Sequence, residues 1–207
     1  MRNCLVNLGR KAEDKEDRMQ DHKIAVIGLG YVGLPLALEF GKYYPTIGYD
    51  TDPSRISSLR NYIDSNGEMD KAALQSSPLF MVDSNADVLE DCTIYVITLP
   101  TPVGLDHKPD LSFLISANKL VGRYLKKGDL VIFESTVYPG ATEDDCIPIL
   151  CQESNLKLNH DFGVGYSPER VNPGDKNRPI TQIVKVTSGS NLSRMKKIHQ
   201  MALTCRK

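Results

Sequence analysis

A glycine-rich turn constrains the fold of this chain more than any other feature of its sequence. The turn, GLGYVG, holds Gly28, Gly30 and Gly33 and joins the apolar run KIAVI to the apolar segment LPLALEF. Gly28 would make the turn, Gly30 would let backbone amides approach a pyrophosphate, and Gly33 would let a helix pack closely against a strand. The turn therefore predicts a dinucleotide site, with a tight turn that binds no ligand as the alternative.

Strand-like and helix-like segments alternate from residue 23 onward. We expect strands at residues 23–27, 46–49, 79–82, 93–98, 130–133, 162–164 and 183–186. We expect helices at residues 31–42, 53–59, 85–89, 111–125, 141–151 and 191–202, and a short one within the polar connection 61–78. Such alternation predicts an α/β fold, a Rossmann-type doubly wound, mostly parallel sheet with helices on both faces.

Two of these helices carry more detailed expectations. The helix at 53–59 begins with Pro53, which fits the first helical position after an Asp cap. The helix at 111–125 has Leu111, Leu114, Ile115 and Asn118 at helical spacing, which predicts that these residues share one face.

The chain divides into three parts by composition. Residues 1–22 mix both signs of charge and lack the apolar stretch of a secretory signal, so we expect a flexible N-terminal extension. Residues 23–190 form the expected dinucleotide-binding domain, and residues 191–207 form a basic terminal helix. With 207 residues and 41% hydrophobic content, the chain can bury one substantial core.

Charge and cysteine content exclude several classes of partner. The net charge of -1 provides no long-range field for nucleic acid or anionic lipid, and the apolar runs are strand-sized, so we expect neither nucleic acid nor a membrane as partner. The five cysteines and four histidines are scattered without the spacing of a metal site. We therefore expect no metal and a cytoplasmic location.

An acidic residue at the end of the second expected strand indicates which dinucleotide binds. Asp50 follows Gly28 by roughly 20 residues, the separation at which an acidic side chain binds the adenosine ribose. Its carboxylate would repel a 2′-phosphate, which favours NAD over NADP. The alternative is that Asp50 caps the helix at Pro53. Arg55 could contact the same end of the cofactor or be a solvated helix residue.

Three further motifs, ITLPTPV, FESTVYPGATE and GYSPERVNPGDKNR, follow the glycine turn in order. Together the four segments resemble the nucleotide-sugar 6-dehydrogenase family, the UDP-glucose and GDP-mannose dehydrogenases, over residues 23–190. The last two motifs are most similar to the branch that oxidises UDP-N-acetylhexosamines. The resemblance implies that a C6 alcohol is oxidised through the aldehyde to a carboxylate, with NAD as oxidant and a cysteine thioester as intermediate.

The resemblance also implies site residues. It places Tyr31, Val32, Asp50, Arg55, Thr101 and Thr136 around NAD, and Glu169, Arg170 and Val171 beside the sugar of the UDP-sugar substrate. Thr136 could orient water or the nicotinamide, and Glu169 could act as general base, so both are candidate catalytic residues.

Each of these side chains also has a simpler interpretation. Thr101 lies between two prolines and could be part of a stiff turn. Thr136 could cap the helix that follows. SPER could be a polar turn, and the basic cluster of Arg170, Lys176 and Arg178 could be an ordinary solvated loop.

The sequence departs from the family pattern in its second half. The family's catalytic cysteine motif, and its catalytic lysine and asparagine, have no counterpart here, and Cys146 and Cys151 fall on an expected helix. We therefore expect a chain that binds NAD and does not complete the oxidation alone. Full-length members of the family are expected to be homodimers.

Two other classes of function stay open at this point. One is a non-catalytic nucleotide-binding or docking module, for which Ile198, Met201 and Leu203 on the last helix could form an exposed apolar face; the alternative is that they pack onto the sheet. The other is a different Rossmann dehydrogenase, against which ESTVYPG and YSPERVNPGD argue.

Overall fold

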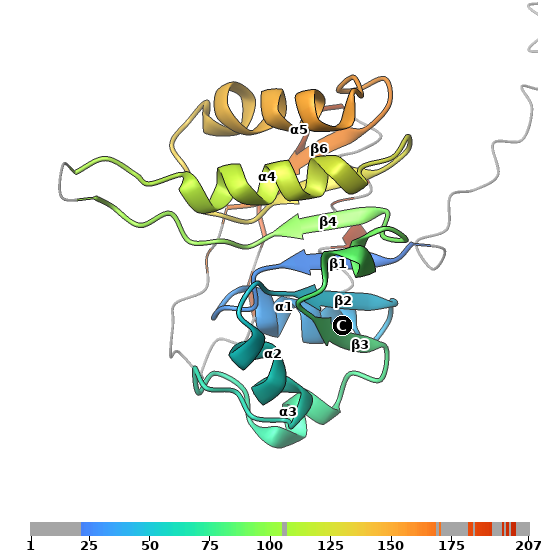
Figure 1. Ribbon diagram of the computed structural model, residues 1–207, viewed down its shortest axis with the longest axis vertical. Helices are drawn as coiled ribbons and strands as arrows, with labels where there is room; N and C mark the ends of the chain where they lie inside the picture. The colour runs from blue at the N-terminus through green and yellow to red at the C-terminus, as the bar shows by residue number, and fades with distance from the viewer. Residues whose placement is uncertain are drawn as a thin grey trace, which may run out of the picture.

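The computed structural model describes residues 22–104, 107–168, 170, 182–183, 185–191, 196, 198 and 200–201. These residues form a seven-stranded sheet in the order β3-β2-β1-β4-β5-β6-β7 (Figure 1). The strands are β1 Ile24–Ile27, β2 Thr46–Tyr49, β3 Phe80–Asp83, β4 Ile94–Ile97, β5 Leu130–Phe133, β6 Gly163–Tyr166 and β7 Ser188–Gly189. Strands β1 to β6 pair in parallel, and β7 pairs antiparallel with β6.

Helices connect the parallel strands. They are α1 Gly33–Phe40, α2 Pro53–Arg60, α3 Lys71–Gln75, α4 Ser112–Tyr124 and α5 Ile147–Ser154, with a 3₁₀ turn at Ala86–Leu89 and a π-helical turn at Thr142–Cys146. Asp52 caps α2 by accepting the N–H of Ser54 at 2.8 Å, and Pro53 follows it as expected. The predicted α/β Rossmann-type fold is confirmed.

Both faces of the sheet are buried. On β1, Ile24 and Val26 belong to the core that α1 covers, whereas Ala25 and Ile27 belong to the core that α4 and α5 cover. A strand buried on both faces has no polar alternation, which is why β1 and β4 appear in the sequence as continuous apolar runs.

The chain reverses its direction of winding between β1 and β4. Ile27 lies beside Tyr49 of β2 on one side and beside Ile97 of β4 on the other, so these strands end level. The connections after β1 and β4 run to opposite faces, and they part at the carboxyl ends of the strands. Open α/β sheets bind their ligands at such a switch point.

The structure differs from expectation along α4 and after β5. Ile115 is exposed, because the buried face of α4 runs through Leu114, Ala117, Asn118 and Val121. The helix expected at 141–151 begins as a π-helical turn before α5. Pro148 explains this change, since it has no N–H to donate to the preceding turn.

The end of the described chain also differs. The strand expected at 183–186 is not formed by the described residues of that range; Lys185 instead pairs with Glu134, and pairing with β6 begins at Ser188. His22, assigned to the extension, is buried and lies with Nδ1 2.8 Å from the Thr93 hydroxyl. Residues 1–21 lie outside the described part.

Two described residues of the last helix pack onto the sheet. Ile198 and Met201 are 2% and 1% exposed and belong to the core that α1 also covers. A Cβ on Gly165 would lie 2.0 Å from the Cδ1 atom of Ile198, so the glycine of β6 makes room for this side chain. The proposed exposed face is therefore wrong for these two residues, and Leu203 lies outside the described residues.

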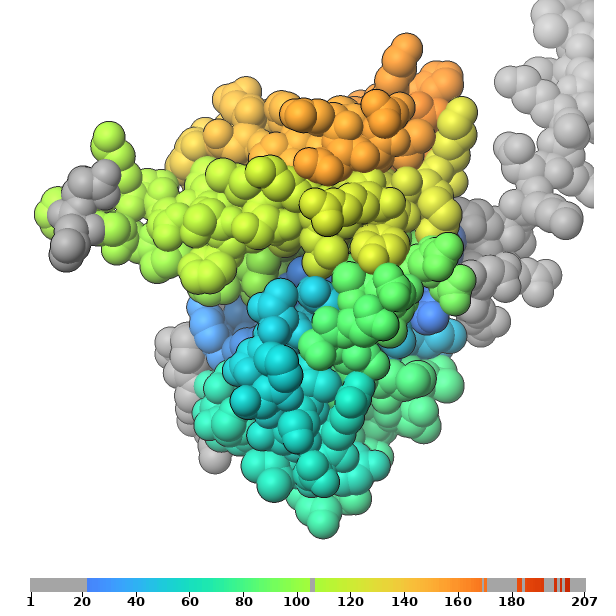
Figure 2. All heavy atoms as spheres, in the orientation of Figure 1, coloured from blue at the N-terminus to red at the C-terminus, as the bar shows by residue number. Residues whose placement is uncertain are grey.

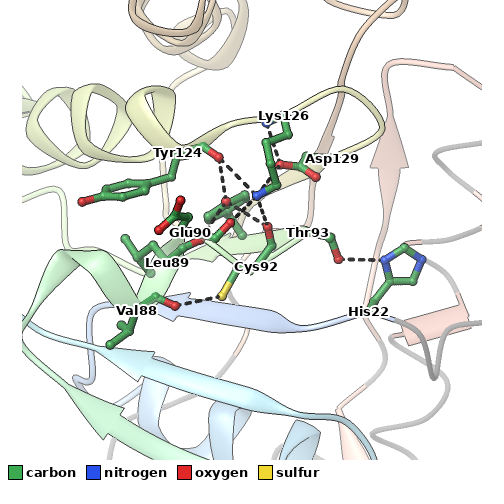
Figure 3. Close-up of polar contacts among 10 residues, drawn as sticks. His22, Val88, Leu89, Glu90, Cys92, Thr93, Tyr124, Lys126 and Asp129 are labelled. Carbon is green, nitrogen blue, oxygen red and sulfur yellow. Dashed lines mark hydrogen bonds and ion pairs between the residues drawn. The ribbon is translucent and has the colours of Figure 1, made fainter.

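A polar network closes the amino end of β4 (Figure 3). The Tyr95 hydroxyl lies 3.1, 3.0 and 3.2 Å from the carbonyl oxygens of Leu89, Cys92 and Tyr124. Lys126 donates from Nζ to the Cys92 and Tyr124 carbonyls as well. Burial raises the pKa of Tyr95 well above its ordinary value, so the phenol stays protonated and can donate.

Two segments shape the outer surface. Between β4 and α4 an arm projects from the body, held by a hydrogen bond from the Gly104 N–H to the Lys108 carbonyl (Figures 1 and 2). At the edge of the sheet, Arg60 donates to the Val82 carbonyl on the open side of β3 at 3.2 Å and to the Asp83 carboxylate at 2.9 Å. Among the described helices, none is both long and apolar enough to cross a membrane.

We expect Tyr95→Phe to lower the free energy of unfolding by about 1–2 kcal/mol, because the buried hydroxyl that lies among three carbonyls is lost. The Leu89 carbonyl keeps the Cys92 N–H, and Lys126 still donates to the other two carbonyls. Urea denaturation of both proteins measures the difference. Tyr43→Phe, which changes an exposed ring, is the matched control and should leave stability unaltered. Equal midpoints for Tyr95→Phe and the wild type would contradict the role assigned to this network.

Candidate functional site

A cavity of about 440 Å³ lies at the switch point, between the carboxyl ends of β1, β4 and β5. Most of the residues expected around the cofactor line it, namely Gly28, Gly30, Tyr31, Val32, Asp50, Thr101 and Thr136. Gly33 and Arg55 lie outside its lining. The structure thus brings together residues that are more than 100 positions apart in the sequence, from 28 to 136.

The three glycines of the turn have different surroundings. Gly28 has a φ of +94°, which disfavours other residues. A Cβ on Gly33 would lie 1.9 Å from the Gly28 carbonyl oxygen and 2.4 Å from the Thr98 hydroxyl, so α1 packs here on bare backbone. A Cβ on Gly30 would meet nothing within 4 Å. The space beside Gly30 belongs to the cavity. A ligand could therefore approach the backbone at this glycine.

Thr98 secures the turn from the end of β4. Its hydroxyl lies 3.0 Å from the carbonyl oxygen of Ile27 and 2.8 Å from that of Gly28. Thr98 is not among the residues that the sequence motifs predict for the site. The only signal was a hydroxyl side chain at the end of an otherwise apolar strand.

Asp50 lies at the mouth of the cavity and is already hydrogen-bonded to the turn. One carboxylate oxygen accepts the Leu29 N–H at 2.8 Å, and the other accepts the Asp52 N–H at 3.0 Å. Because Asp52 is the cap of α2, the alternative that Asp50 caps this helix is wrong. A carboxylate has further lone pairs, so Asp50 can still accept hydrogen bonds from a ligand.

A second cavity of about 290 Å³ adjoins the first. Gly28, Asp50 and Leu99 line both cavities, and Tyr49 and Phe113 are among the residues that line the second. The second cavity is therefore largely apolar and shares the Asp50 carboxylate with the first. Such a cavity suits a heterocycle whose attached sugar faces the carboxylate.

Arg55 is neither solvated nor part of either cavity lining. Its side chain is 7% exposed, and its guanidinium donates to the Leu29 carbonyl and to Asp64. The interpretation as a solvated helix residue is therefore wrong.

A hydrogen bond joins the loops that follow β4 and β5. Thr101 donates from its hydroxyl to the Thr136 backbone carbonyl. The Thr136 side chain is exposed at the cavity, and the next helical turn begins at Thr142 after Ala141, so the alternative that Thr136 caps it is wrong. The hydrogen bond therefore connects two loops that both line the first cavity.

The floor of the first cavity contains polar groups that the sequence analysis did not single out. Glu134 lines the cavity and forms an ion pair with Lys185, and both side chains are more than nine-tenths buried. The Ser135 hydroxyl, also at the cavity, is buried with no hydrogen-bond partner among the described residues. A buried hydroxyl without a protein partner can hydrogen-bond to a ligand in the cavity.

Of the residues expected beside the sugar, Glu169 and Val171 lie outside the described residues, and Arg170 is exposed. None of the described cysteines lines either cavity. Burial raises the pKa of Cys92 to about 11 and also raises the pKa of Cys146, so both thiols stay protonated and unreactive.

Residues 22–202 match the UDP-glucose/GDP-mannose dehydrogenase family, NAD binding domain. The chain is 52% identical over 172 residues to the UDP-N-acetyl-D-glucosamine 6-dehydrogenase of Pseudomonas aeruginosa, which covers 83% of this chain and 41% of that protein. It is 50% identical over 168 residues to the enzyme of the same name from Salmonella typhi, covering 81% of this chain and 40% of that protein.

The structure is similar to that of a UDP-D-ManNAc dehydrogenase from Pyrococcus horikoshii, with a TM-score of 0.82 and 30% identity over 89% of this chain and 45% of that one. The chain thus spans about 40% of the length of the curated relatives that it matches. The match over residues 22–202 continues past Ser190, where the resemblance seen in the motifs stopped. This chain belongs to the UDP-glucose/GDP-mannose dehydrogenase family and contains its NAD-binding domain.

Proposed function

We propose that this chain supplies the NAD-binding part of a UDP-N-acetylhexosamine 6-dehydrogenase, which oxidises the C6 alcohol of a UDP-sugar to a carboxylate for polysaccharide biosynthesis. The observation that carries this proposal is the identity of 52% and 50% with two proteins named UDP-N-acetyl-D-glucosamine 6-dehydrogenase. The chain spans about 40% of those proteins, and the part that it contains is their NAD-binding domain.

The two cavities suggest how NAD lies. Tyr49 and Phe113 would hold the adenine in the second cavity, and Asp50 would accept hydrogen bonds from the adenosine ribose. The glycine turn beside Gly30 would hold the pyrophosphate, since the start of α1 favours negative charge. Thr136 would lie near the nicotinamide in the first cavity. Bound NAD would supply the hydride acceptor for the sugar carbon.

Gly28, Tyr31, Val32 and Thr101 complete the proposed cofactor contacts, because they line the same cavity. Gly33 contributes indirectly by keeping the turn compact.

The proposed catalytic residues are Thr136 and Glu169. The exposed hydroxyl of Thr136 would orient water near the nicotinamide, and Glu169 would accept the proton of that water. Arg170 and Val171 would contact the sugar. These roles follow from the family motif, and the structure supports them to the extent that Thr136 lines the cavity.

The context of the reaction is also part of the proposal. We propose a homodimer for the longer enzyme and a cytoplasmic location, which suits the unpaired thiols of Cys92, Cys146 and Cys151. Residues 23–190 would act as the cofactor domain, with residues 1–22 as an extension and residues 191–207 as a terminal helix.

A chimeric enzyme tests the function. Residues 22–190 of this chain replace the matching segment of the Pseudomonas aeruginosa relative, and NADH formation is followed with UDP-N-acetylglucosamine, UDP-N-acetylgalactosamine and UDP-glucose. We expect activity with an N-acetylated substrate. The same chimera carrying Gly30→Ala is the inactive control. A folded chimera that binds NAD and oxidises only UDP-glucose would contradict the proposed substrate class.

Two substitutions in the glycine turn should affect different properties, NAD binding in one case and stability in the other. Gly30→Ala should leave the thermal midpoint unchanged, because its Cβ meets nothing within 4 Å, and should weaken NAD binding because the methyl occupies ligand space. Gly33→Ala should destabilise the fold by about 1–3 kcal/mol or more, because its Cβ would overlap the Gly28 carbonyl. Calorimetry and NAD titration separate the two effects. Unchanged NAD affinity in Gly30→Ala would contradict the assigned position of the pyrophosphate.

Asp50→Asn tests the choice of cofactor. Loss of the charge should weaken NAD binding and narrow the preference for NAD over NADP, since the repulsion of a 2′-phosphate disappears. Asp52→Asn is the matched control, because it removes a charge two positions away and keeps a side chain that can cap α2. Competition titrations with NAD and NADP measure the ratio of the two affinities. If Asp50→Asn and Asp52→Asn change this ratio equally, Asp50 has no specific role.

A further inference from the structure

A buried arginine holds one carbonyl group of the glycine turn from behind. Arg55 donates to the Leu29 carbonyl oxygen from Nε at 3.0 Å and from Nη2 at 2.8 Å. Its remaining nitrogen, Nη1, donates to Asp64 at 2.6 Å. The side chains of Arg55 and Asp64 are 7% and 0% exposed, so this contact is shielded from water.

The contact determines which way the next amide points. The peptide between Leu29 and Gly30 is trans, as are all the described peptides, so its C=O and N–H groups point in opposite directions. With the carbonyl turned toward Arg55, the Gly30 N–H points away from it, and Gly30 lines the cavity. No acceptor among the described residues takes this N–H. It is therefore a donor available to an anion.

Asp64 keeps the arginine in place and cancels its charge. Its carboxylate also accepts the backbone N–H groups of Asn66, Glu68 and Met69 at 3.1, 2.9 and 2.9 Å, which ties it to its own loop. Burial alone would raise the pKa of Asp64, but the hydrogen bonds from Arg55 and the backbone bring it below its ordinary value. The pair is therefore ionised and close to neutral in sum.

A lysine could not replace this arginine. Only the planar guanidinium can grip one carbonyl with two N–H groups and reach a carboxylate with a third nitrogen. The charge of a lysine would be present, but the geometry that fixes the peptide would be lost.

We propose that Arg55 and Asp64 are positioning residues, which orient the Leu29–Gly30 peptide so that the Gly30 N–H meets the pyrophosphate of NAD, and that Arg55 does not itself bind the cofactor. This inference rests on the proposed position of NAD at the glycine turn. It differs from the role around NAD that the family resemblance implies for Arg55.

The test compares ligands with and without phosphate on the whole chain. NAD, ADP and adenosine are titrated into the wild type and into Arg55→Met, Arg55→Lys and Asp64→Ala, while the ¹⁵N–¹H signal of the Gly30 amide is followed. Arg60→Met is the control, because it removes a positive charge from the same helix without contacting the turn.

We expect Arg55→Met and Asp64→Ala to weaken the binding of NAD and of ADP about tenfold or more, as for a lost hydrogen bond to a charged group. The same variants should change the affinity for adenosine by less than about twofold. Arg55→Lys should weaken the binding of ADP as well, and Arg60→Met should leave the affinity for all three ligands unchanged. In the wild type the Gly30 amide signal should shift with ADP, and in Arg55→Lys this shift should shrink.

The sign of the Asp64→Ala effect separates positioning from direct attraction. If Arg55 attracted the phosphates through its charge, loss of the neighbouring carboxylate would strengthen ADP binding. Positioning predicts the opposite. Stronger or unchanged ADP binding in Asp64→Ala would overturn the proposal, and so would wild-type ADP binding in Arg55→Lys. An equal loss of adenosine binding in these variants would also overturn it.

Removing one partner of a buried pair can unfold a protein, so Asp64→Asn is measured beside Asp64→Ala. Asp64→Asn keeps the shape and one acceptor oxygen, and weaker ADP binding in this variant supports the same conclusion. If the wild type binds neither NAD nor ADP, the proposed cofactor position fails together with this inference. If Gly30→Ala no longer binds ADP but the Arg55 and Asp64 variants bind ADP with wild-type affinity, only this inference fails.

Discussion

The approach of α1 to the end of β1 is the constraint on which the rest of this domain depends. A Cβ on Gly33 would overlap the Gly28 carbonyl, so helix and strand meet here backbone to backbone. The Thr98 hydroxyl lies within hydrogen-bond distance of the same carbonyl and joins the end of β4 to the contact. Three elements therefore share one point, and the cavity opens directly beside it.

The sequence predicts this part of the molecule well because its signals are local. Glycines at fixed spacing, continuous apolar strands and Pro53 after an acidic cap each reflect a physical requirement within a few residues. The expected strands at 46–49 and 130–133 coincide with β2 and β5. The family motifs add Thr101 and Thr136, which the fold brings to one cavity.

What the sequence does not show are contacts that depend on distant segments. Lys185 leaves its expected strand to pair with Glu134, 51 positions earlier. Ile198 is apolar on a basic helix, and only the space left by Gly165 decides that it is buried. Arg55 looks like a surface residue until the Leu29 carbonyl, 26 positions away, is seen beside it. Pattern analysis cannot identify such partners, because neither partner is unusual in its own segment.

The arginine at the edge of β3 has a consequence for assembly. An exposed edge strand is a template to which a strand of another chain can add, and it is a common route to aggregation. Arg60 occupies the outward carbonyl of Val82 and places a charge where an incoming backbone would have to lie. Sheet extension at this edge would require that charge to move. Pairing between two copies of the domain through β3 is therefore disfavoured.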